Sequence, residues 1–381
     1  MASPMETGDG LLLRLRLPGG TISLIGLRAL ADVAEQFGNG VIELSARANA
    51  QVRGLSPEHV ETAAEMLEYA GLVNTDAGRN VVGGPLSGHD PHALIDLSPL
   101  VHQASSLLIP RTQLQGLPPK FAVVFDDGGT ASTRHLSADM CIGAVVSETG
   151  EVMMQIELGR TLADADALVL LVDPADVIGV LITGAELCAN NEMRMSALVE
   201  QLGRANVATT LTNGVDVHWQ HHTSYPRPHC APLGVLEHRT PGLVNVGAAP
   251  LLGRCTPIML RTLSTICEST SSLVRFTPWR GVVILGVEEA RLDEVINGLE
   301  QAGFSSEPVN RAHLISACVG APDCRSGLGD TVGAALDLLG SCAPLTTTIH
   351  FAGCEKRCGA DAEQVLVADE RGLFQKVSPA C

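Results

Sequence analysis

The chain has 381 residues, of which 45% are hydrophobic and 18% charged, and its formal net charge is −17. A chain of this length is longer than one that usually folds around a single hydrophobic core. We therefore expect two or more domains, or one large domain built from repeats. The negative charge argues against a nucleic-acid partner, because phosphate binding depends on basic surface. Any anionic ligand must therefore be bound by a local cluster of arginine and lysine side chains.

The sequence shows no membrane or export segment. Its longest apolar runs, "ALVLLV" and "VIGVLI", fall well short of the roughly 20 residues that a membrane helix requires. The first ten residues contain no basic region followed by an apolar one. We therefore expect a cytoplasmic protein without a membrane partner, in which most of the 11 cysteines are thiols or metal ligands rather than disulfides.

An internal repeat is the clearest long-range pattern. Residues 41–72 align without a gap with residues 273–304, so Gly54 matches Gly286 and Gly71 matches Gly303. Each copy predicts a strand that ends at the first glycine and a helix that runs to the second. In the first copy, Ser56 is the predicted N-cap of the helix and Gly71 its C-cap.

The repeat divides the chain into four predicted parts. These are a half-domain at 8–73, a first α/β unit without a metal cluster at 84–216, a second half-domain at 225–306 and a C-terminal unit at 307–381. Residues 74–91 are rich in glycine and proline and predict a linker. The fold class is therefore α+β, with an internal pseudo-twofold and a ligand expected between the halves.

Four cysteines of the C-terminal unit have the spacing of a ligand set. Cys318 and Cys324 form a C-x5-C pair, and Cys354 and Cys358 form a C-x3-C pair. Structural zinc prefers C-x2-C turns, and a redox disulfide would require only one pair and an oxidising compartment. Four thiolates are the usual ligands of a 4Fe-4S cluster. We expect that cluster, with zinc and a disulfide as the alternatives.

These motifs resemble a known superfamily. The two cysteine pairs, placed after a duplicated half-domain, resemble the sulfite and nitrite reductase superfamily, in which four such cysteines bind a 4Fe-4S cluster. Within it, "HFAGCEKRC" and "ACVGAPDC" are most similar to the precorrin-3B synthase family. This resemblance implies hydroxylation of precorrin-3A at carbon 20, with lactone formation from the ring A acetate. It further implies dioxygen and reducing equivalents, supplied by NADH, an NADH-linked reductase or another electron-donor protein.

The superfamily resemblance also implies binding residues for an anionic tetrapyrrole. The segment "SARANAQVRG" supplies Arg47 and Arg53, "GRNV" supplies Arg79 and Asn80, and "LPPKFAV" supplies Lys120. Sulfite reductases carry a second lysine where this chain has Ala122, which argues against sulfite reduction. In the second copy, Trp279 matches Arg47, and the neighbouring Arg275 and Arg280 are further candidates for ligand carboxylates.

Two alternatives to the oxygenase remain. The first is a sirohaem-dependent sulfite or nitrite reductase, and the second is an electron-transfer or cluster-sensing protein. The precorrin-3B synthase family is also associated with a mononuclear non-haem iron, and such sites often use two histidines and a carboxylate. The pattern at His218, His221, His222 and His229 favours a solvated loop over an iron site, and His350 favours a packing role or a supporting role beside the cysteine loop.

Overall fold

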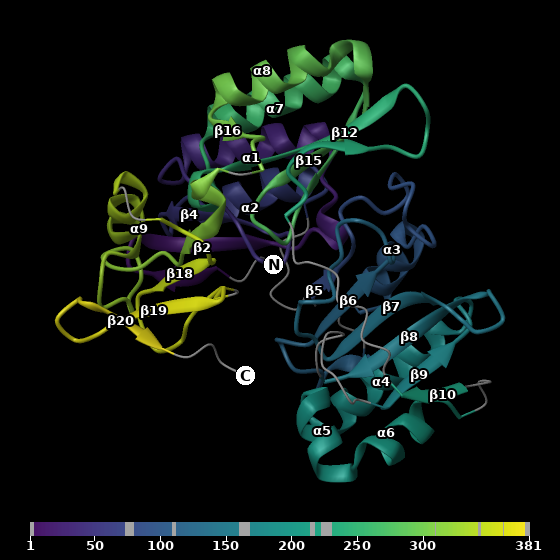
Figure 1. Ribbon diagram of the computed structural model, residues 1–381. Coiled ribbons are helices and arrows are strands. Elements are labelled where there is room, and N and C mark those ends of the chain that lie inside the picture. Colours follow the sequence, from purple (N-terminus) through teal and green to yellow (C-terminus); the bar gives the residue numbers. More distant parts are fainter. Residues whose placement is uncertain are drawn as a thin grey trace.

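The computed structural model of the chain describes residues 4–72, 80–108, 112–159, 168–213, 218–221, 231–308, 310–341, 344–360 and 362–377. These residues form four β-sheets with their covering helices. Helices α1, α2, α7 and α8 gather at one end, and the two α/β units lie to either side of the centre (Figure 1). Within the described part of the chain, no helix is long and apolar enough to span a membrane.

The first half-domain is an antiparallel sheet with two helices. Its strand order is β1-β2-β4-β3. The bounds are β1 Met5–Thr7, β2 Gly10–Leu15, β3 Ile42–Leu44, β4 Ala50–Leu55, α1 Leu24–Gln36 and α2 Val60–Tyr69. Helix α1 begins where the Ser23 side chain accepts a hydrogen bond from the Gly26 backbone nitrogen, and it buries Leu27, Leu30 and Ala34 along one face.

The second half-domain repeats this arrangement with the strand order β11-β12-β15-β14. The bounds are β11 Gly234–Glu237, β12 Leu243–Pro250, β14 Leu273–Phe276, β15 Val282–Glu288, β16 Phe304–Ser305, α7 Pro257–Thr270 and α8 Leu292–Ala302. Gly54 and Gly286 have φ angles of 72° and 76°, a left-handed conformation that favours glycine. The aligned glycines therefore mark the same backbone feature in both copies.

The predicted boundaries of helix α2 are half right. Gly71 has a φ of 79° just beyond the helix, as expected for a C-terminal glycine. The predicted N-cap at Ser56 is wrong, because the backbone nitrogen of His59 donates to the Ser56 carbonyl in a separate turn and the helix begins only at Val60.

Reciprocal contacts across α1 and α7 show the pseudo-twofold directly. Arg28 forms an ion pair with Glu268, and Arg261 forms one with Glu35, at 2.5 Å and 2.6 Å. Arg28 and Glu35 occupy the positions in α1 that Arg261 and Glu268 occupy in α7. Each half therefore gives the other the same pair of contacts.

One hydrophobic core joins the two half-domains. Leu27 and Leu30 of α1 and their counterparts Leu260 and Leu263 of α7 are fully buried in the same cluster. Burying a leucine side chain contributes about 1.5–3 kcal/mol, so this shared face strongly favours association of the halves. Strand β13 (Arg254–Cys255), from the second half, also pairs with β3 of the first.

The first α/β unit is a six-stranded sheet in the order β10-β9-β8-β7-β6-β5. Its strands are β5 Asn80–Val82, β6 Ala122–Asp126, β7 Met140–Val146, β8 Val152–Leu158, β9 Leu168–Val172 and β10 His218–His221. Its helices are α3 Ser98–Leu107, α4 Val177–Asn191, α5 Met195–Leu202 and α6 Arg204–Leu211. The linker predicted at 74–91 is wrong in its second part, because β5 pairs with β6 and the residues after it are buried.

The C-terminal unit is a smaller copy of the same pattern. Its elements are β17 Ile315–Ala317, α9 Thr331–Gly340, β18 Ile349–Ala352, β19 Gln364–Ala368 and β20 Phe374–Val377. The pairs β17–β18 and β18–β19 are parallel and β19–β20 is antiparallel, as are β5–β6, β6–β7 and β7–β8 in the first unit. These correspondences confirm the predicted duplicated α+β architecture.

Candidate functional site

Two adjoining cavities lie where the half-domains meet the α/β units. The larger, here called the cationic cavity, has a volume of about 790 Å³ and lies between β2, β4, the turn at 45–49 and the loops at 135–137 and 357–360. The smaller, here called the thiol cavity, has a volume of about 430 Å³ and is lined by the two cysteine loops and by residues of β1, β2, β3 and β4. Arg14, Ser45 and Cys358 are among the residues that line both cavities.

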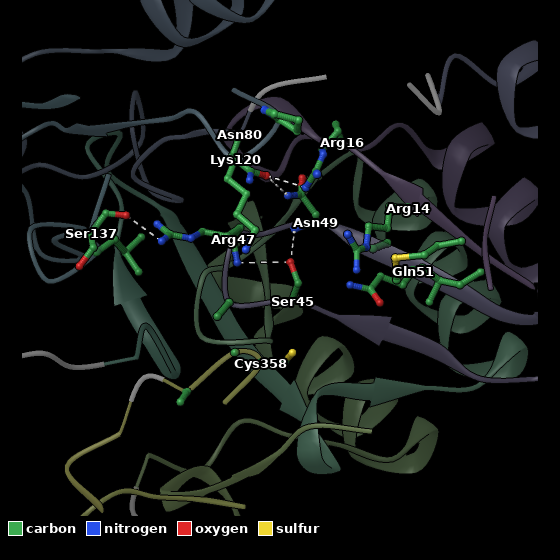
Figure 2. A pocket seen from close by; sticks show the side chains of 18 of the residues that line it. Arg14, Arg16, Ser45, Arg47, Asn49, Gln51, Asn80, Lys120, Ser137 and Cys358 are labelled. Carbon is green, nitrogen blue, oxygen red and sulfur yellow. Dashed lines mark hydrogen bonds between the residues drawn. The ribbon is translucent and has the colours of Figure 1, made fainter. Parts of the chain in front are cut away.

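Five cationic side chains line the cationic cavity, in a protein whose net charge is strongly negative. They are Arg14, Arg16, Arg47, Lys120 and Arg357. Figure 2 shows Arg14, Arg16, Arg47 and Lys120 gathered above Cys358. This is the local cluster of positive charge that the composition requires of any anion-binding site.

Strand β2 places two of these arginines. Successive residues of a strand face opposite sides of the sheet. Leu13 and Leu15 are therefore buried in the shared core, while Arg14 and Arg16 face the cavity. Within the described part of the chain, the buried Nε of Arg14 has no hydrogen-bond partner. A ligand oxygen placed there would satisfy this donor.

Asn80 is held in place at the cavity wall. Its Oδ1 accepts hydrogen bonds from Arg16 Nη1 at 2.7 Å and from Asn49 Nδ2 at 2.8 Å, and Asn49 Oδ1 accepts from the Leu17 nitrogen at 2.9 Å. The same contacts orient the Arg16 guanidinium. The preceding residue, Arg79, lies outside the described residues, so its predicted role stays a prediction.

Arg47 projects from a tight turn at residues 45–49. The Ser45 hydroxyl accepts from the nitrogens of Arg47 and Asn49, and Ala48 has a positive φ of 55°. Arg47 Nη2 donates to the Ser137 carbonyl of the first α/β unit at 2.7 Å (Figure 2). Lys120 is exposed at the rim of the same cavity. Three of the predicted binding residues, Arg47, Asn80 and Lys120, thus line this cavity from separate parts of the fold.

His135 is a cavity residue that the sequence analysis did not single out. It lines the cationic cavity, and its ring centroid lies 5.2 Å from that of Trp279, the counterpart of Arg47. Ala122, by contrast, is buried in a small apolar cluster with Leu136 and Cys141 and does not line the cavity.

All four predicted cysteine ligands line the thiol cavity. The Gly353 nitrogen donates to Cys318 Sγ at 3.1 Å, a contact that stabilises a thiolate. Burial raises the pKa of the Cys358 thiol, and so do the neighbouring thiols Cys318, Cys354 and Cys324. The two pairs, distant in sequence, therefore lie close enough to interact electrostatically.

Glycine is required in the first cysteine loop. Gly320 has a φ of 67°, and a Cβ there would lie 2.4 Å from Thr331 Oγ1 and 2.7 Å from the Gly329 carbonyl oxygen. Thr331 in turn donates to the Cys318 carbonyl at 2.6 Å. This loop is thus packed tightly against the start of α9.

The arrangement of the thiols fits a polynuclear group. In the described part of the chain, no three histidine, cysteine, aspartate or glutamate side chains converge closely enough to hold a single metal ion. The four thiols are among the residues that line a cavity of about 430 Å³, and a backbone N–H donates to one sulfur. Four thiolates are the usual donor set of a 4Fe-4S cluster, so the residues present fit that group.

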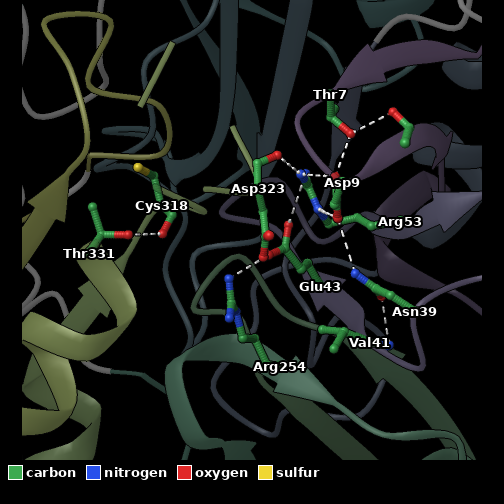
Figure 3. A network of polar contacts seen from close by, with 11 residues as sticks. Thr7, Asp9, Asn39, Val41, Glu43, Arg53, Arg254, Cys318, Asp323 and Thr331 are labelled. Carbon is green, nitrogen blue, oxygen red and sulfur yellow. Dashed lines mark hydrogen bonds and ion pairs between the residues drawn. The ribbon is translucent and has the colours of Figure 1, made fainter. Parts of the chain in front are cut away.

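Arg53 is engaged with protein groups. It is 5% exposed; Nε and Nη2 donate to the Asp9 carboxylate at 3.1 Å and 2.9 Å, and Nη2 also donates to the Asp323 carbonyl at 2.8 Å (Figure 3). Arg275 donates to the carbonyls of Pro85 and Ser87 and lines neither cavity. These contacts give both arginines a part in packing the loops.

The candidate iron-ligand histidines do not form a described site. His218 and His221 belong to β10, but their side chains are not described, and His222 and His229 lie outside the described residues. His350 is fully buried, with Nδ1 2.8 Å from Ser316 Oγ.

The other described cysteines are buried in the protein interior: Cys141, Cys188, Cys255 and Cys267. Burial raises the pKa of Cys141, Cys188 and Cys267 to about 12. They are therefore inert thiols at neutral pH.

Comparisons of the sequence with known proteins identify relatives of this chain. The family described as "Nitrite/Sulfite reductase ferredoxin-like half domain" matches residues 3–70 and 236–302. A precorrin-3B synthase from Sinorhizobium is 30% identical over 94% of this chain and 77% of its own length. The chain belongs to the sulfite and nitrite reductase superfamily. Like its relatives in that superfamily, it is an oxidoreductase.

Other members of the superfamily are nearly as similar. The chloroplastic ferredoxin–nitrite reductase of Zea mays is 27% identical over 94% of this chain and 68% of its own length. A sulfite reductase of Mycolicibacterium paratuberculosis is 24% identical, and the chain spans 60% of its length. The structure of the Mycobacterium tuberculosis NirA protein superposes with a TM-score of 0.81 at 21% identity, over 96% of this chain and 73% of that one. That likeness shows the superfamily fold.

The sequence analysis missed Arg14, Arg16 and Arg357 as cavity residues. A signal for the first two was present, because "LLLRLRL" alternates leucine with arginine and so predicts a strand with a cationic face. Arg357 lies inside the C-x3-C motif, a pattern that predicts metal ligands and does not by itself predict a binding arginine.

Proposed function

We propose that the chain is a precorrin-3B synthase of aerobic cobalamin biosynthesis, a monooxygenase that hydroxylates precorrin-3A at carbon 20 and forms a lactone from the ring A acetate. One atom of dioxygen enters the product, and the other leaves as water after taking up two electrons from the donor and two protons, at least one of them from solvent. The observation that carries the proposal is the cationic cavity, which shares its wall with the thiol cavity. The Sinorhizobium relative supports the choice within the superfamily.

The thiol cavity is the proposed site of a 4Fe-4S cluster held by Cys318, Cys324, Cys354 and Cys358. When bound, such a cluster supplies single electrons from the donor. The surrounding residues hold the loops: the Gly353 N–H donates to Cys318 Sγ, and Thr331 ties the Cys318 carbonyl to α9. The donor itself stays a proposal, with NADH, an NADH-linked reductase and a reduced carrier protein as candidates.

The cationic cavity is the proposed site of the tetrapyrrole. The acetate and propionate arms of precorrin-3A are carboxylates, and guanidinium groups bind carboxylates in a planar, two-pronged geometry. Arg14, Arg16 and Arg47 approach from the first half-domain, and Lys120 approaches from the first α/β unit. Because these groups come from separate elements, they fix the orientation of the macrocycle as well as its affinity, and orientation decides which carbon reacts.

Asn80 and Arg79 complete the proposed binding set in different ways. Asn80 keeps Arg16 pointed into the cavity through its hydrogen bond. Arg79 is proposed from the superfamily resemblance alone. Arg53 was predicted to bind substrate, but its contacts to Asp9 and Asp323 favour a role in holding the cysteine loop.

A mononuclear non-haem iron remains a proposal from the family resemblance. No three-residue group for it lies among the described residues, so the ligands stay unassigned. The proposed reaction takes place in the cytoplasm and involves no nucleic acid.

A sirohaem-dependent nitrite or sulfite reductase is the second candidate, because such enzymes match the chain at 27% and 24% identity. The same cations would bind the carboxylates of sirohaem. Ala122 speaks against sulfite reduction, since its buried methyl group offers no charge to a small anion. A pure electron-transfer protein would not require five cations around a large cavity.

The test starts from protein purified without oxygen. We expect broad iron-sulfur absorption, with acid-labile sulfide at cluster stoichiometry and iron in excess of it. Incubation with precorrin-3A, a reductant and isotopically labelled dioxygen should give a product heavier by one labelled oxygen atom. Sharp sirohaem bands would move the assignment to the reductases. Zinc without sulfide, or a product without the label, would contradict the proposal.

A further inference from the structure

We infer that Arg53 and Arg280, one from each half-domain, form a clamp that positions the two cysteine loops. Each guanidinium donates to the backbone carbonyl of a residue directly beside a cysteine: Arg53 to Asp323, and Arg280 to Gly359. Asp323 precedes Cys324 and Gly359 follows Cys358, so each cysteine pair is held once. The position of the two loops follows from these contacts alone. That the loops hold a cluster rests on the proposed function.

Arg53 holds the first loop through a buried network. Its planar guanidinium binds both oxygens of Asp9 and the carbonyl of Asp323 together. The Gly8 nitrogen donates to the same carbonyl at 2.9 Å. Figure 3 shows Asp9, Arg53 and Asp323 in this network, with Glu43 and Arg254 beside them. Because three contacts share one rigid fork, lysine cannot replace this arginine.

Arg280 holds the second loop from the turn that corresponds to residues 45–49. In both turns the fourth residue has a positive φ, 55° for Ala48 and 56° for Arg280. In both, the first residue accepts from the fifth through its side chain, at Ser45 and at Thr277. A non-glycine residue in this conformation is uncommon, and it is the Arg280 side chain that reaches Gly359.

The two copies of the turn place an arginine in different cavities. In the first copy the third residue, Arg47, faces the cationic cavity, whereas in the second copy the fourth, Arg280, lines the thiol cavity. Gly359 has a φ of 73°, a conformation that favours glycine, and a Cβ on it would lie 2.9 Å from Arg280 Nη2, so a larger residue would displace the guanidinium. The half-domains therefore set the spacing between the two cysteine pairs.

The experiment compares Arg280→Met and Arg280→Lys with the control Arg371→Met. Arg371 belongs to the same C-terminal unit and lines neither cavity; it faces Asp369 on the surface, and its side chain is 81% exposed. We measure metal loss to a chelator, the reduction potential and the EPR spectrum of the reduced protein. We expect Arg280→Met to lose metal about tenfold faster, the factor for one lost hydrogen bond to a charged group, with a changed spectrum and potential. Arg280→Lys should restore much of the wild-type behaviour, and Arg371→Met should equal the wild type.

The buried partner is tested with Arg53→Lys and with the double variant Asp9→Asn/Arg53→Met, which leaves no unpaired buried charge. Both should lose metal faster than the wild type, because neither supplies the three-contact fork. Unchanged metal loss and spectrum in the Arg280 and double variants would overturn the clamp. If the wild-type protein held zinc without sulfide, the proposed function would fail, while the chelator comparison would still test the clamp.

Discussion

The two α/β units share one topology but differ at their loop ends. In the C-terminal unit the loops after β17 and β18 carry the cysteines around the thiol cavity. In the first unit the corresponding loops after β5 and β6 pack Leu86 and Ala131 against Val283 and Leu285 of the second half-domain. Leu285 is the counterpart of Arg53. One unit thus keeps a space for a group, and the other fills the corresponding space with apolar side chains.

The filled side also holds buried charges. Asp90, Asp126 and Asp127 are almost fully buried there, and Arg134 pairs with Asp126 at 3.0 Å. Hydrogen bonds to loop nitrogens satisfy most of these carboxylate oxygens. The comparison teaches that a common backbone can be stabilised by a ligand on one side and by packing and polar networks on the other.

The largest effect should follow from removing a thiol. Cys354→Ser should reduce bound iron and sulfide to near zero, because three thiolates cannot complete a four-ligand site. Metal and sulfide analysis measures this. Cys267→Ala, in the interior of the second half-domain, should retain both, and loss of iron in that control would show that the site is not specific to the cysteine loops.

Tetrapyrrole binding should depend on Arg47 but not on Trp279, which occupies the matching position in the second copy. Arg47→Met should weaken tetrapyrrole binding by about 10–100-fold, as expected for one charge-assisted contact, and Arg47→Met with Arg79→Met should abolish it. Titration of the protein with the tetrapyrrole measures the affinity. The matched change at the other copy, Trp279→Met, removes no charge and should have a small effect; equal losses at both positions would contradict the proposed asymmetry.

Asp127 should give the filled side a characteristic pH dependence. Burial, together with the neighbouring carboxylates of Asp126 and Asp90, raises its pKa from 3.8 to about 7. The folded protein therefore holds a proton that the unfolded chain releases above pH 4, so the free energy of unfolding falls as the pH rises from about 4 to 7. Asp127→Asn should remove this decline and stabilise the protein by about 1–3 kcal/mol at pH 8. Urea unfolding across this range tests it, and an unchanged slope would contradict it.

His89 should act in the opposite direction. Burial, together with the charges of Arg275 and His238, lowers its pKa from 6.5 to about 4. The His238 Nε2 lies 3.0 Å from His89 Nδ1. The unfolded chain gains this proton first, so stability falls as the pH drops from 6.5 to 4. His89→Gln should reduce that loss by about 1 kcal/mol, a modest value because the ring is only half-buried. Acid unfolding in the Asp127→Asn background separates the two groups.

The smallest effect should come from the reciprocal ion pairs. Arg28→Met and Arg261→Met should each lower Tm slightly, because exposed pairs gain little from Coulomb attraction in water. Arg261 contacts both Asp32 and Glu35, so its variant should show the larger change. Melting curves at low and high salt measure this, and an effect that persists at high salt would point to packing instead.

Sequence patterns captured the parts of the molecule that local chemistry dictates. The glycines at 54 and 286 indicated the duplication because both positions have a left-handed backbone. The cysteine spacing led us to expect the four thiols at one site, and all four line one cavity. The contacts of Arg53 could not be foreseen, because Asp9 and Asp323 meet it only through tertiary folding. The sequence did not predict the buried strand β5, because the glycines beside it are typical of a linker. In the structure, Gly83 and Gly84 instead allow close packing against Val101 and Asp127.

The ion pairs Arg28–Glu268 and Arg261–Glu35 have the arrangement of contacts at a symmetric dimer interface. Contacts in which residue i meets j while j meets i are typical of symmetric homodimers. The half-domains are thus equivalent to two subunits joined into one polypeptide. Once joined, each subunit could mutate alone, which a true homodimer forbids. The arginines of one copy and the leucine and tryptophan of the other are the product of that freedom.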